Sequence, residues 1–203
     1  MPINTASASD MTSSFALGIP SRAEWVTTVI ADFDHFLLDH AANERKASAM
    51  AMSMVAHYPN RARLVSQMID LALEEMNHFR QVYRIIEARG LSLADDEKDA
   101  YVNQLRQHFQ KGSEAYFLDR LLASAVIEAR GAERFGLLAQ AIEDPKTARF
   151  YEVLARSEAE HEHLFIDLAK HYFDHELIRP RLDYWLEIEA EILASLPITA
   201  RLH

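Results

Sequence analysis

The chain has 203 residues, a hydrophobic content of 49% and a formal net charge of −10, which is enough apolar material for one domain with its own core. It contains no cysteine, so disulfides, thiolate zinc sites, thiol catalysis and iron–sulfur clusters are excluded. The negative charge argues against a protein that coats nucleic acid over its whole surface. No apolar run is long enough to span a membrane, and the lack of cysteine suits a cytoplasmic protein.

Glycine and proline are scarce, with five and six residues, which favours a mostly helical protein. Residues 1–20 are polar and lack the basic and apolar regions of a signal peptide. We expect them to form a partly ordered leader, and we expect residues 21–203 to form a single domain.

The expected helices follow from apolar spacing and from the positions of helix breakers. Ser21 and Glu24 have the spacing of a capping box and predict the start of the first helix. The long helices should cover residues 22–57, 62–89, 114–142, 145–173 and 180–196. Pro180 is expected to open the last one, and a crossover from residue 92, with a shorter helix up to residue 110, separates the second from the third.

This order of helices predicts an all-α, ferritin-like four-helix bundle. Two antiparallel helical hairpins would be joined by one long crossover, and an additional C-terminal helix would follow. A bundle without catalytic activity, such as a helical interaction module, would have the same connectivity. The connectivity therefore leaves the function open.

Glutamate and histidine recur in a pattern that the two hairpins share. The chain contains three Glu-x-x-His sequences, Glu75–His78 in the second long helix and Glu158–His161 and Glu160–His163 in the fourth. Each of these helices follows a helix with a glutamate among apolar residues, Glu44 in the first and Glu128 in the third. Each such glutamate lies at about the same depth from the hairpin tip as the Glu-x-x-His sequence opposite it.

Residues three apart lie on one face of a helix, so a Glu-x-x-His pair can bind a metal from one side. Four carboxylates balance the charge of two divalent cations, whereas without metal they would repel one another and lose hydration. We therefore predict a carboxylate-bridged dinuclear metal site with the ligands Glu44, Glu75, His78, Glu128, Glu158 and His161. Oxygen and nitrogen ligands suit iron or manganese, and zinc less well.

Three nearby glutamates compete with this assignment. The pair Glu160–His163 lies about 200° around the helix from Glu158–His161, so the two pairs cannot share a face. Apolar neighbours favour Glu158–His161. Glu74 has no histidine three residues later and is not chosen. Glu133 could contact a metal ligand without binding the metal itself, or it could pair with an arginine at the surface, and we favour the surface pair.

The segments FLLDHAANERKASAM, LALEEMNHFRQVYRIIEARG, IEARGAERF and LARSEAEHEHLF resemble the bacterial tRNA 2-methylthio-N6-isopentenyladenosine hydroxylases, over about residues 22–173. The resemblance implies oxygen-dependent hydroxylation of the isopentenyl group on a modified adenosine next to the anticodon. It also implies that the six residues above bind two iron ions, that dioxygen is the co-substrate and that the partner is tRNA with a prenylated, methylthiolated adenosine. Glu160 departs from the family, where a basic residue would be unsurprising.

An external electron donor, a ferredoxin or a reductase, is a further expected partner. Hydroxylation by dioxygen consumes two electrons from outside, and this chain has neither cysteine for a cluster nor a flavin fingerprint. The alternative is a ferritin- or rubrerythrin-like ferroxidase or peroxidase, which would need no organic substrate.

Substrate contacts are predicted from weaker patterns. Apolar side chains that could line a channel for the prenyl group, or could equally be ordinary core, are Phe33, Leu37, Phe79, Leu121 and Phe135. Basic residues at the starts of the second and fourth helices are expected at one end of the bundle, where they could bind phosphate, namely Arg61, Arg63, Lys146 and Arg149. Outward faces are expected for Arg80, Arg84, Arg130 and Arg134.

Overall fold

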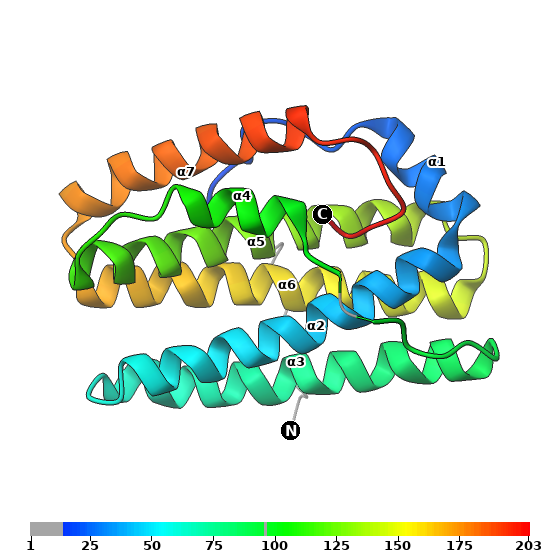
Figure 1. Cartoon of the computed structure of the whole chain (residues 1–203), viewed down its shortest axis with the longest axis horizontal. Helices are drawn as coiled ribbons and strands as arrows, with labels where there is room; N and C mark the ends of the chain where they lie inside the picture. Colours follow the sequence, from blue (N-terminus) through cyan, green and yellow to red (C-terminus); the bar gives the residue numbers. More distant parts are fainter. Residues whose placement is uncertain (1–13, 96) are drawn as a thin grey trace, which may run out of the picture.

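The computed structural model describes residues 14–95 and 97–203, and this part of the chain contains helices and no strands (Figure 1). The helices are α1 (Ala23–Ala31), α2 (Phe33–His57), α3 (Ala62–Ala88), α4 (Ala100–Gln107), α5 (Ser113–Ala141), α6 (Pro145–Tyr172) and α7 (His175–Ser195). Helices α2 and α3 form one antiparallel hairpin, and α5 and α6 form the other. The predicted all-α bundle with two hairpins, one crossover and an additional C-terminal helix is confirmed.

The turns of the two hairpins lie at opposite ends of the bundle (Figure 1). Arg61, at the turn between α2 and α3, binds Glu114 at the start of α5 at 2.6 Å. Arg63 lies 3.3 Å from His171 near the end of α6. The prediction that these arginines share a bundle end with Lys146 and Arg149 was wrong, because the crossover runs the length of the bundle and turns the second hairpin around.

The first predicted helix is divided at Asp32 into α1 and α2. The backbone of Asp32 leaves the helical conformation, with φ −133° and ψ 56°. This bend carries Trp25 of α1 back over the bundle, where its ring meets Phe36 edge-to-face at 6.2 Å. Both rings are buried, and their contact stabilises the bend.

The expected capping box at the start of the first helix does not form. Ser21 lies one residue before the helix cap, and both its N–H and its hydroxyl donate to the Glu133 carboxylate at 2.8 Å. The prediction for Pro180 was also wrong, since α7 begins at His175 and contains this proline near its start. Ile178 lies in the extra turn and is buried in the core, which favours the earlier start.

Arg130 and Arg134 were predicted to face outward, and both are buried. The Arg130 guanidinium donates to both carboxylate oxygens of Glu189 on α7, at 2.8 and 2.9 Å. Arg134 donates to the Ser21 hydroxyl at 3.1 Å and to the carbonyl of Leu202. Helix α7 and the segment after it cover this face of α5, which a simple four-helix bundle would leave in water.

The part of the predicted leader that the structure describes, residues 14–20, follows the bundle surface. The Ser14 N–H donates to Glu162 at 2.9 Å, and the Ile19 carbonyl accepts from Arg130 at 2.8 Å. The rest of the predicted leader, residues 1–13, lies outside the described residues. Within the described chain, no helix combines the length and apolar character that a membrane crossing requires.

The pair of Arg130 and Glu189 gives a test of this packing. Glu189→Gln leaves a buried guanidinium without its counter-ion, and loss of one partner of a buried ion pair costs about 3 kcal/mol or more. We expect the free energy of unfolding, measured by chemical denaturation, to fall by about this amount. Glu187→Gln, at an exposed position of the same helix, is the control, and an equal effect of both substitutions would contradict the assignment.

Candidate metal centre

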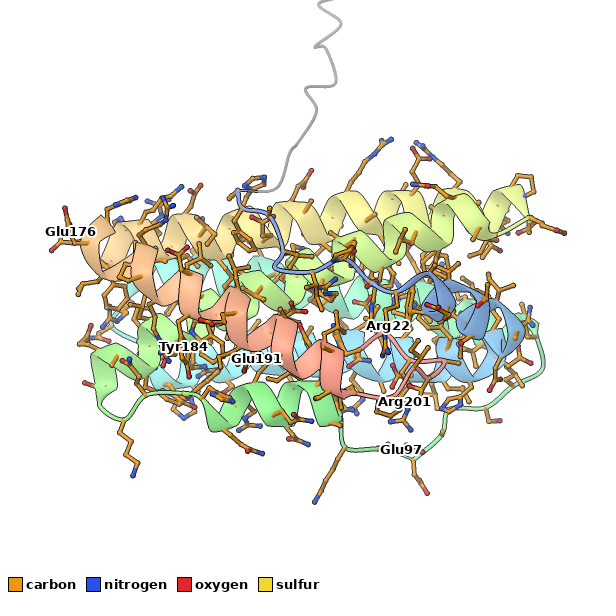
Figure 2. The ribbon with its side chains drawn as sticks, turned by 90° about the horizontal axis from the view of Figure 1, so that it is seen from above. Arg22, Glu97, Glu176, Tyr184, Glu191 and Arg201 are labelled. Carbon is orange, nitrogen blue, oxygen red and sulfur yellow. The ribbon has the colours of Figure 1, made fainter. Side chains whose placement is uncertain are left out.

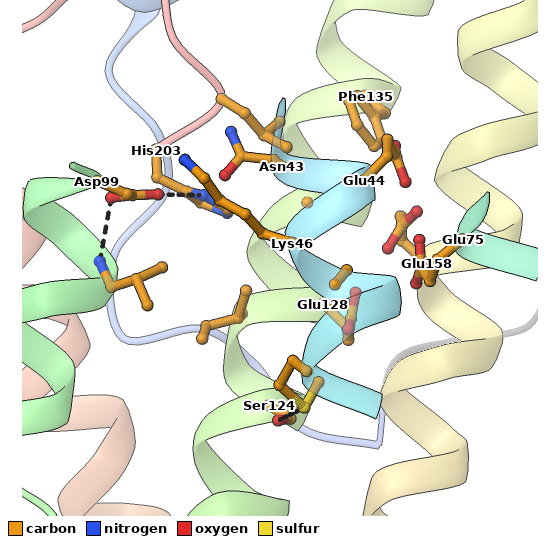
Figure 3. Close-up of a pocket in the computed structure, with 16 residues that line it drawn as sticks. Asn43, Glu44, Lys46, Glu75, Asp99, Ser124, Glu128, Phe135, Glu158 and His203 are labelled. Carbon is orange, nitrogen blue, oxygen red and sulfur yellow. Dashed lines mark hydrogen bonds and ion pairs between the residues drawn. The ribbon is translucent and has the colours of Figure 1, made fainter. Parts of the chain in front are cut away.

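The six predicted ligands meet in the middle of the bundle. Glu44 comes from α2, Glu75 and His78 from α3, Glu128 from α5, and Glu158 and His161 from α6. None of these side chains is more than 7% exposed. Glu44, Glu75, Glu128 and Glu158 lie around one space between the two hairpins (Figure 3).

The ligand atoms form two overlapping groups, and within each group they lie within 4.8 Å of one another. The groups are Glu44, Glu75, His78 and Glu158, and Glu75, Glu128, Glu158 and His161. Glu75 and Glu158 belong to both groups, as expected of carboxylates that bridge two metal ions. Each group has one further glutamate and one histidine, so the two halves of the site match.

Unsatisfied polar atoms support a metal site. The Nδ1 atom of His78 lies 3.5 Å from Glu75, and that of His161 lies 3.0 Å from Glu75 and 3.6 Å from Glu158. Within the described chain these two nitrogens, Glu75 Oε1 and Glu158 Oε1 are buried without hydrogen bonds of acceptable geometry. Buried polar atoms usually have a partner, and two cations among these atoms would provide it.

The electrostatics of the cluster agree with this interpretation. Burial raises the pKa values of Glu44 and Glu128 well above the usual range of a glutamate. Burial alone would lower the pKa of His78, but the carboxylates of Glu44 and Glu75 raise it to about 10. The four carboxylates thus attract positive charge into the core, which is the property that a divalent cation site needs.

One carboxylate outside the cluster is linked to both histidines. Glu74 Oε2 lies 3.4 Å from Nε2 of His161, and this neighbour holds the pKa of Glu74 low, at about 2. The Ser157 hydroxyl donates to Glu74 at 2.7 Å and lies 3.3 Å from Nε2 of His78. Glu74 and Ser157 therefore orient the rings whose Nδ1 atoms face the cluster. The sequence contains a signal for these two residues, because Glu74 directly precedes Glu75 and Ser157 directly precedes Glu158.

Sequence reasoning missed His40, which is fully buried one turn before Glu44. Burial lowers its pKa to about 3, so the ring is neutral. Its Nε2 lies 2.6 Å from Glu44 and its Nδ1 lies 3.2 Å from the hydroxyl of Tyr151, which is also buried. A neutral ring can donate to Glu44 and accept from Tyr151, and this fixes one oxygen of Glu44. The sequence contains one signal for this contact, since His40 and Glu44 are four residues apart and therefore lie on one face of the helix.

The other two competing glutamates, Glu160 and Glu133, lie away from the cluster. Glu160 is exposed, and His163 lies 2.5 Å from the Ser14 hydroxyl on the outer side of α6. Glu133 pairs with Arg130 at 2.5 Å, as expected, but at a partly buried position.

A cavity of about 170 Å³, the inner cavity, reaches the four carboxylates of the cluster (Figure 3). Apolar side chains make up much of its wall, including Met50, Val102, Ile127, Phe135 and Leu202. Gly131 also lines it, and a Cβ atom at this position would lie 3.7 Å from Cγ of Glu158. Of the predicted channel residues only Phe135 lies here, since Phe33, Leu37, Phe79 and Leu121 pack in other parts of the core.

Glu74 gives a test of the histidine orientation. Glu74→Gln weakens the contacts that hold both rings, and loss of such a partner typically lowers metal affinity about 10–100-fold. We expect this loss in a titration of the metal-free protein with ferrous iron under anaerobic conditions. Glu160→Gln, on the exposed side of α6, should leave the affinity unchanged, and equal behaviour of the two variants would refute the role of Glu74.

Comparison with known proteins agrees with the geometry. A sequence profile of the family described as tRNA-(MS[2]IO[6]A)-hydroxylase (MiaE) matches residues 11–203. A Pseudomonas putida protein named tRNA 2-(methylsulfanyl)-N(6)-isopentenyladenosine(37) hydroxylase is 33% identical over 187 residues, which are 92% of this chain and 91% of that protein. A Salmonella typhimurium protein of the same name is 32% identical over 165 residues, or 81% of this chain and 60% of that protein.

A solved structure has the same fold. It is described as protein 43 with aldehyde deformylating oxygenase activity from Synechococcus. It superimposes with a TM-score of 0.88 and 34% sequence identity, and the match covers 92% of this chain and 94% of that one. With the profile match over nearly the whole chain, these relatives show that the chain belongs to the MiaE family of tRNA hydroxylases.

Proposed function

We propose that this protein is an oxygen-dependent hydroxylase of the isopentenyl group on 2-methylthio-N6-isopentenyladenosine, next to the anticodon of tRNA. The proposal rests on membership of the MiaE family and on one observation of the site. That observation is an inner cavity with largely apolar walls that ends on the carboxylates of the cluster. A storage or ferroxidase site needs no such cavity beside its metal ligands.

In this proposal two iron ions are held by Glu44, Glu75, His78, Glu128, Glu158 and His161. Bound iron would supply the activation of dioxygen that hydroxylation of a C–H bond requires.

The residues of the chain then have three tasks. The walls of the inner cavity bind the prenyl group by apolar contact and exclude water from it. His40, Ser157 and Glu74 hold ligand side chains in fixed orientations, so that the substrate meets a preorganised site. Gly131 leaves space beside Glu158, where a larger residue would occupy the cavity.

The reaction also needs a partner that delivers two electrons. We propose an external ferredoxin or reductase, since the sequence contains no cysteine for a cluster of its own. A tRNA substrate would place the reaction in the cytoplasm.

A second candidate substrate is an aldehyde, because the Synechococcus protein of the same fold has aldehyde deformylating oxygenase activity. Polar groups at the inner cavity, among them Lys46, Asn43 and His203, favour a substrate that carries polar atoms beside its apolar group. A nucleoside with a prenyl arm has this character.

A reconstitution assay tests the proposed function. The metal-free protein receives ferrous iron, a chemical reductant, oxygen and tRNA with the modified adenosine, and nucleosides are then analysed by mass spectrometry. We expect a gain of one oxygen atom on the modified adenosine, and we expect Glu128→Ala to abolish it. Binding of iron without any change of the nucleoside would disprove the substrate, and turnover of an added aldehyde instead would support the second candidate.

Gly131→Val tests whether the organic substrate occupies the inner cavity. The added side chain would fill space beside Glu158, and we expect the rate of nucleoside hydroxylation at low substrate concentration to fall about 10-fold or more. Gly136→Val is the matched control, because a Cβ atom at residue 136 has no neighbour within 4 Å. Iron stoichiometry measured on the same samples separates a blocked cavity from a lost metal, and unchanged hydroxylation in iron-loaded Gly131→Val would contradict the assignment.

A further inference from the structure

A second, larger hollow adjoins the inner cavity. This hollow, the outer groove, has a volume of about 680 Å³ and is lined by residues of α2, α4 and α5 and of the segment before α4. The residues that line both hollows are Lys46, Met50, Asp99, Val102, Ser124 and Ile127. A molecule that lies in the outer groove can therefore extend an arm into the inner cavity and reach the cluster.

The outer groove has a charge opposite to that of the whole chain. The chain has a net charge of −10, yet Lys98, Arg106 and Arg120 line the groove together with Lys46. The carboxylates of Glu97 and Asp99 also line it. Glu97 is in an ion pair with Arg201 in the segment that follows α7 (Figure 2), and Asp99 accepts from the N–H of Val102 at 3.1 Å and lies 3.4 Å from the ring of His203.

Two of the cations remain available. Lys98 and Arg106 are exposed and have no ion-pair partner among the residues that the structure describes. Arg120 is half-buried, with its guanidinium 3.5 Å from the Met50 carbonyl and from the Ser53 hydroxyl. Burial lowers the pKa of Arg120, and the charge of Arg106 lowers it further, so an anion between these two arginines would relieve their repulsion.

Aromatic rings lie beside these charges. Phe109 and Tyr116 both line the groove, and their rings meet edge-to-face with 5.5 Å between centroids. Tyr116 is 36% exposed. Proteins that bind single-stranded RNA loops combine such rings, on which unpaired bases stack, with arginine and lysine side chains that contact phosphates.

We propose that the outer groove binds the anticodon loop of the substrate tRNA. Lys98, Arg106 and Arg120 contact phosphates of the loop, and Phe109 and Tyr116 provide a stacking surface for an unpaired base. The prenylated adenosine then lies across the residues common to both hollows, with its isopentenyl arm in the inner cavity. This inference rests on the proposed function and adds to it the surface that the RNA occupies.

The test compares two double substitutions that each remove two positive charges. Lys98→Gln with Arg106→Gln changes the outer groove, whereas Lys146→Gln with Arg149→Gln changes the hairpin turn at the start of α6. Binding of a labelled RNA hairpin with the anticodon-arm sequence and the modified adenosine is measured by fluorescence anisotropy at several salt concentrations. All proteins are loaded with iron, and the iron content is measured.

For the groove variant we expect the affinity to fall at least about 10-fold at low salt. The affinity should also depend less on salt, because the negative slope of log affinity against log salt becomes shallower by about 0.7 for each contact removed. The turn variant should bind as the unchanged protein does. Equal weakening in both variants would show a general charge effect and overturn the proposal, as would weakening in the turn variant alone.

The reconstitution assay separates this inference from the proposed function. If the unchanged protein does not hydroxylate the tRNA, the proposed function fails. If it does so, and the groove variant reacts with the same kcat/KM, the groove assignment fails while the proposed function stands. The expected result is a raised KM for tRNA with little change in kcat, because the substituted side chains lie away from the metal ligands.

Discussion

Four glutamate side chains are buried together in the core of this bundle, and the arrangement of the helices follows from their need for positive charge. Each of Glu44, Glu75, Glu128 and Glu158 would be far more stable in water, and together they repel one another. The cost is acceptable only where positive charge offsets it, and two divalent cations bound by these carboxylates together with His78 and His161 would supply that charge. A histidine three residues after a glutamate faces the same space, so each hairpin contributes a matching half of the cluster.

The same constraint explains how the hairpins pack. Close contact is concentrated within each hairpin, and the space between the hairpins holds the cluster and the inner cavity. Because this space separates the two hairpins, the bundle needs additional packing on its outer surface. Helix α7 provides it, through the buried ion pair of Arg130 and Glu189. The crossover completes the site, because the segment before α4 and α4 itself line the outer groove. Helix α7 therefore stabilises the bundle around the space between the hairpins, and the crossover with α4 shapes the access to that space.

The sequence predicted what depends on local spacing. Helices, hairpin pairing and the six residues that the structure brings together follow from helical periodicity and from equal depth below two turns. It did not predict what depends on packing between distant segments. Arg130 was expected in water because nothing in its own helix shows that α7 covers it. The opposite orientation of the two hairpin turns is set by the length of the crossover, and the contacts of His40 and Glu74 require knowledge of which helix faces which.

Anomalous diffraction can show whether these six residues bind two iron ions. Crystals of the protein grown without oxygen and loaded with ferrous iron would be measured on both sides of the iron absorption edge. We expect two neighbouring anomalous peaks among Glu44, Glu75, His78, Glu128, Glu158 and His161, with Glu75 and Glu158 contacting both. Crystals in which iron is bound only elsewhere, with no peak between the two hairpins, would refute this assignment.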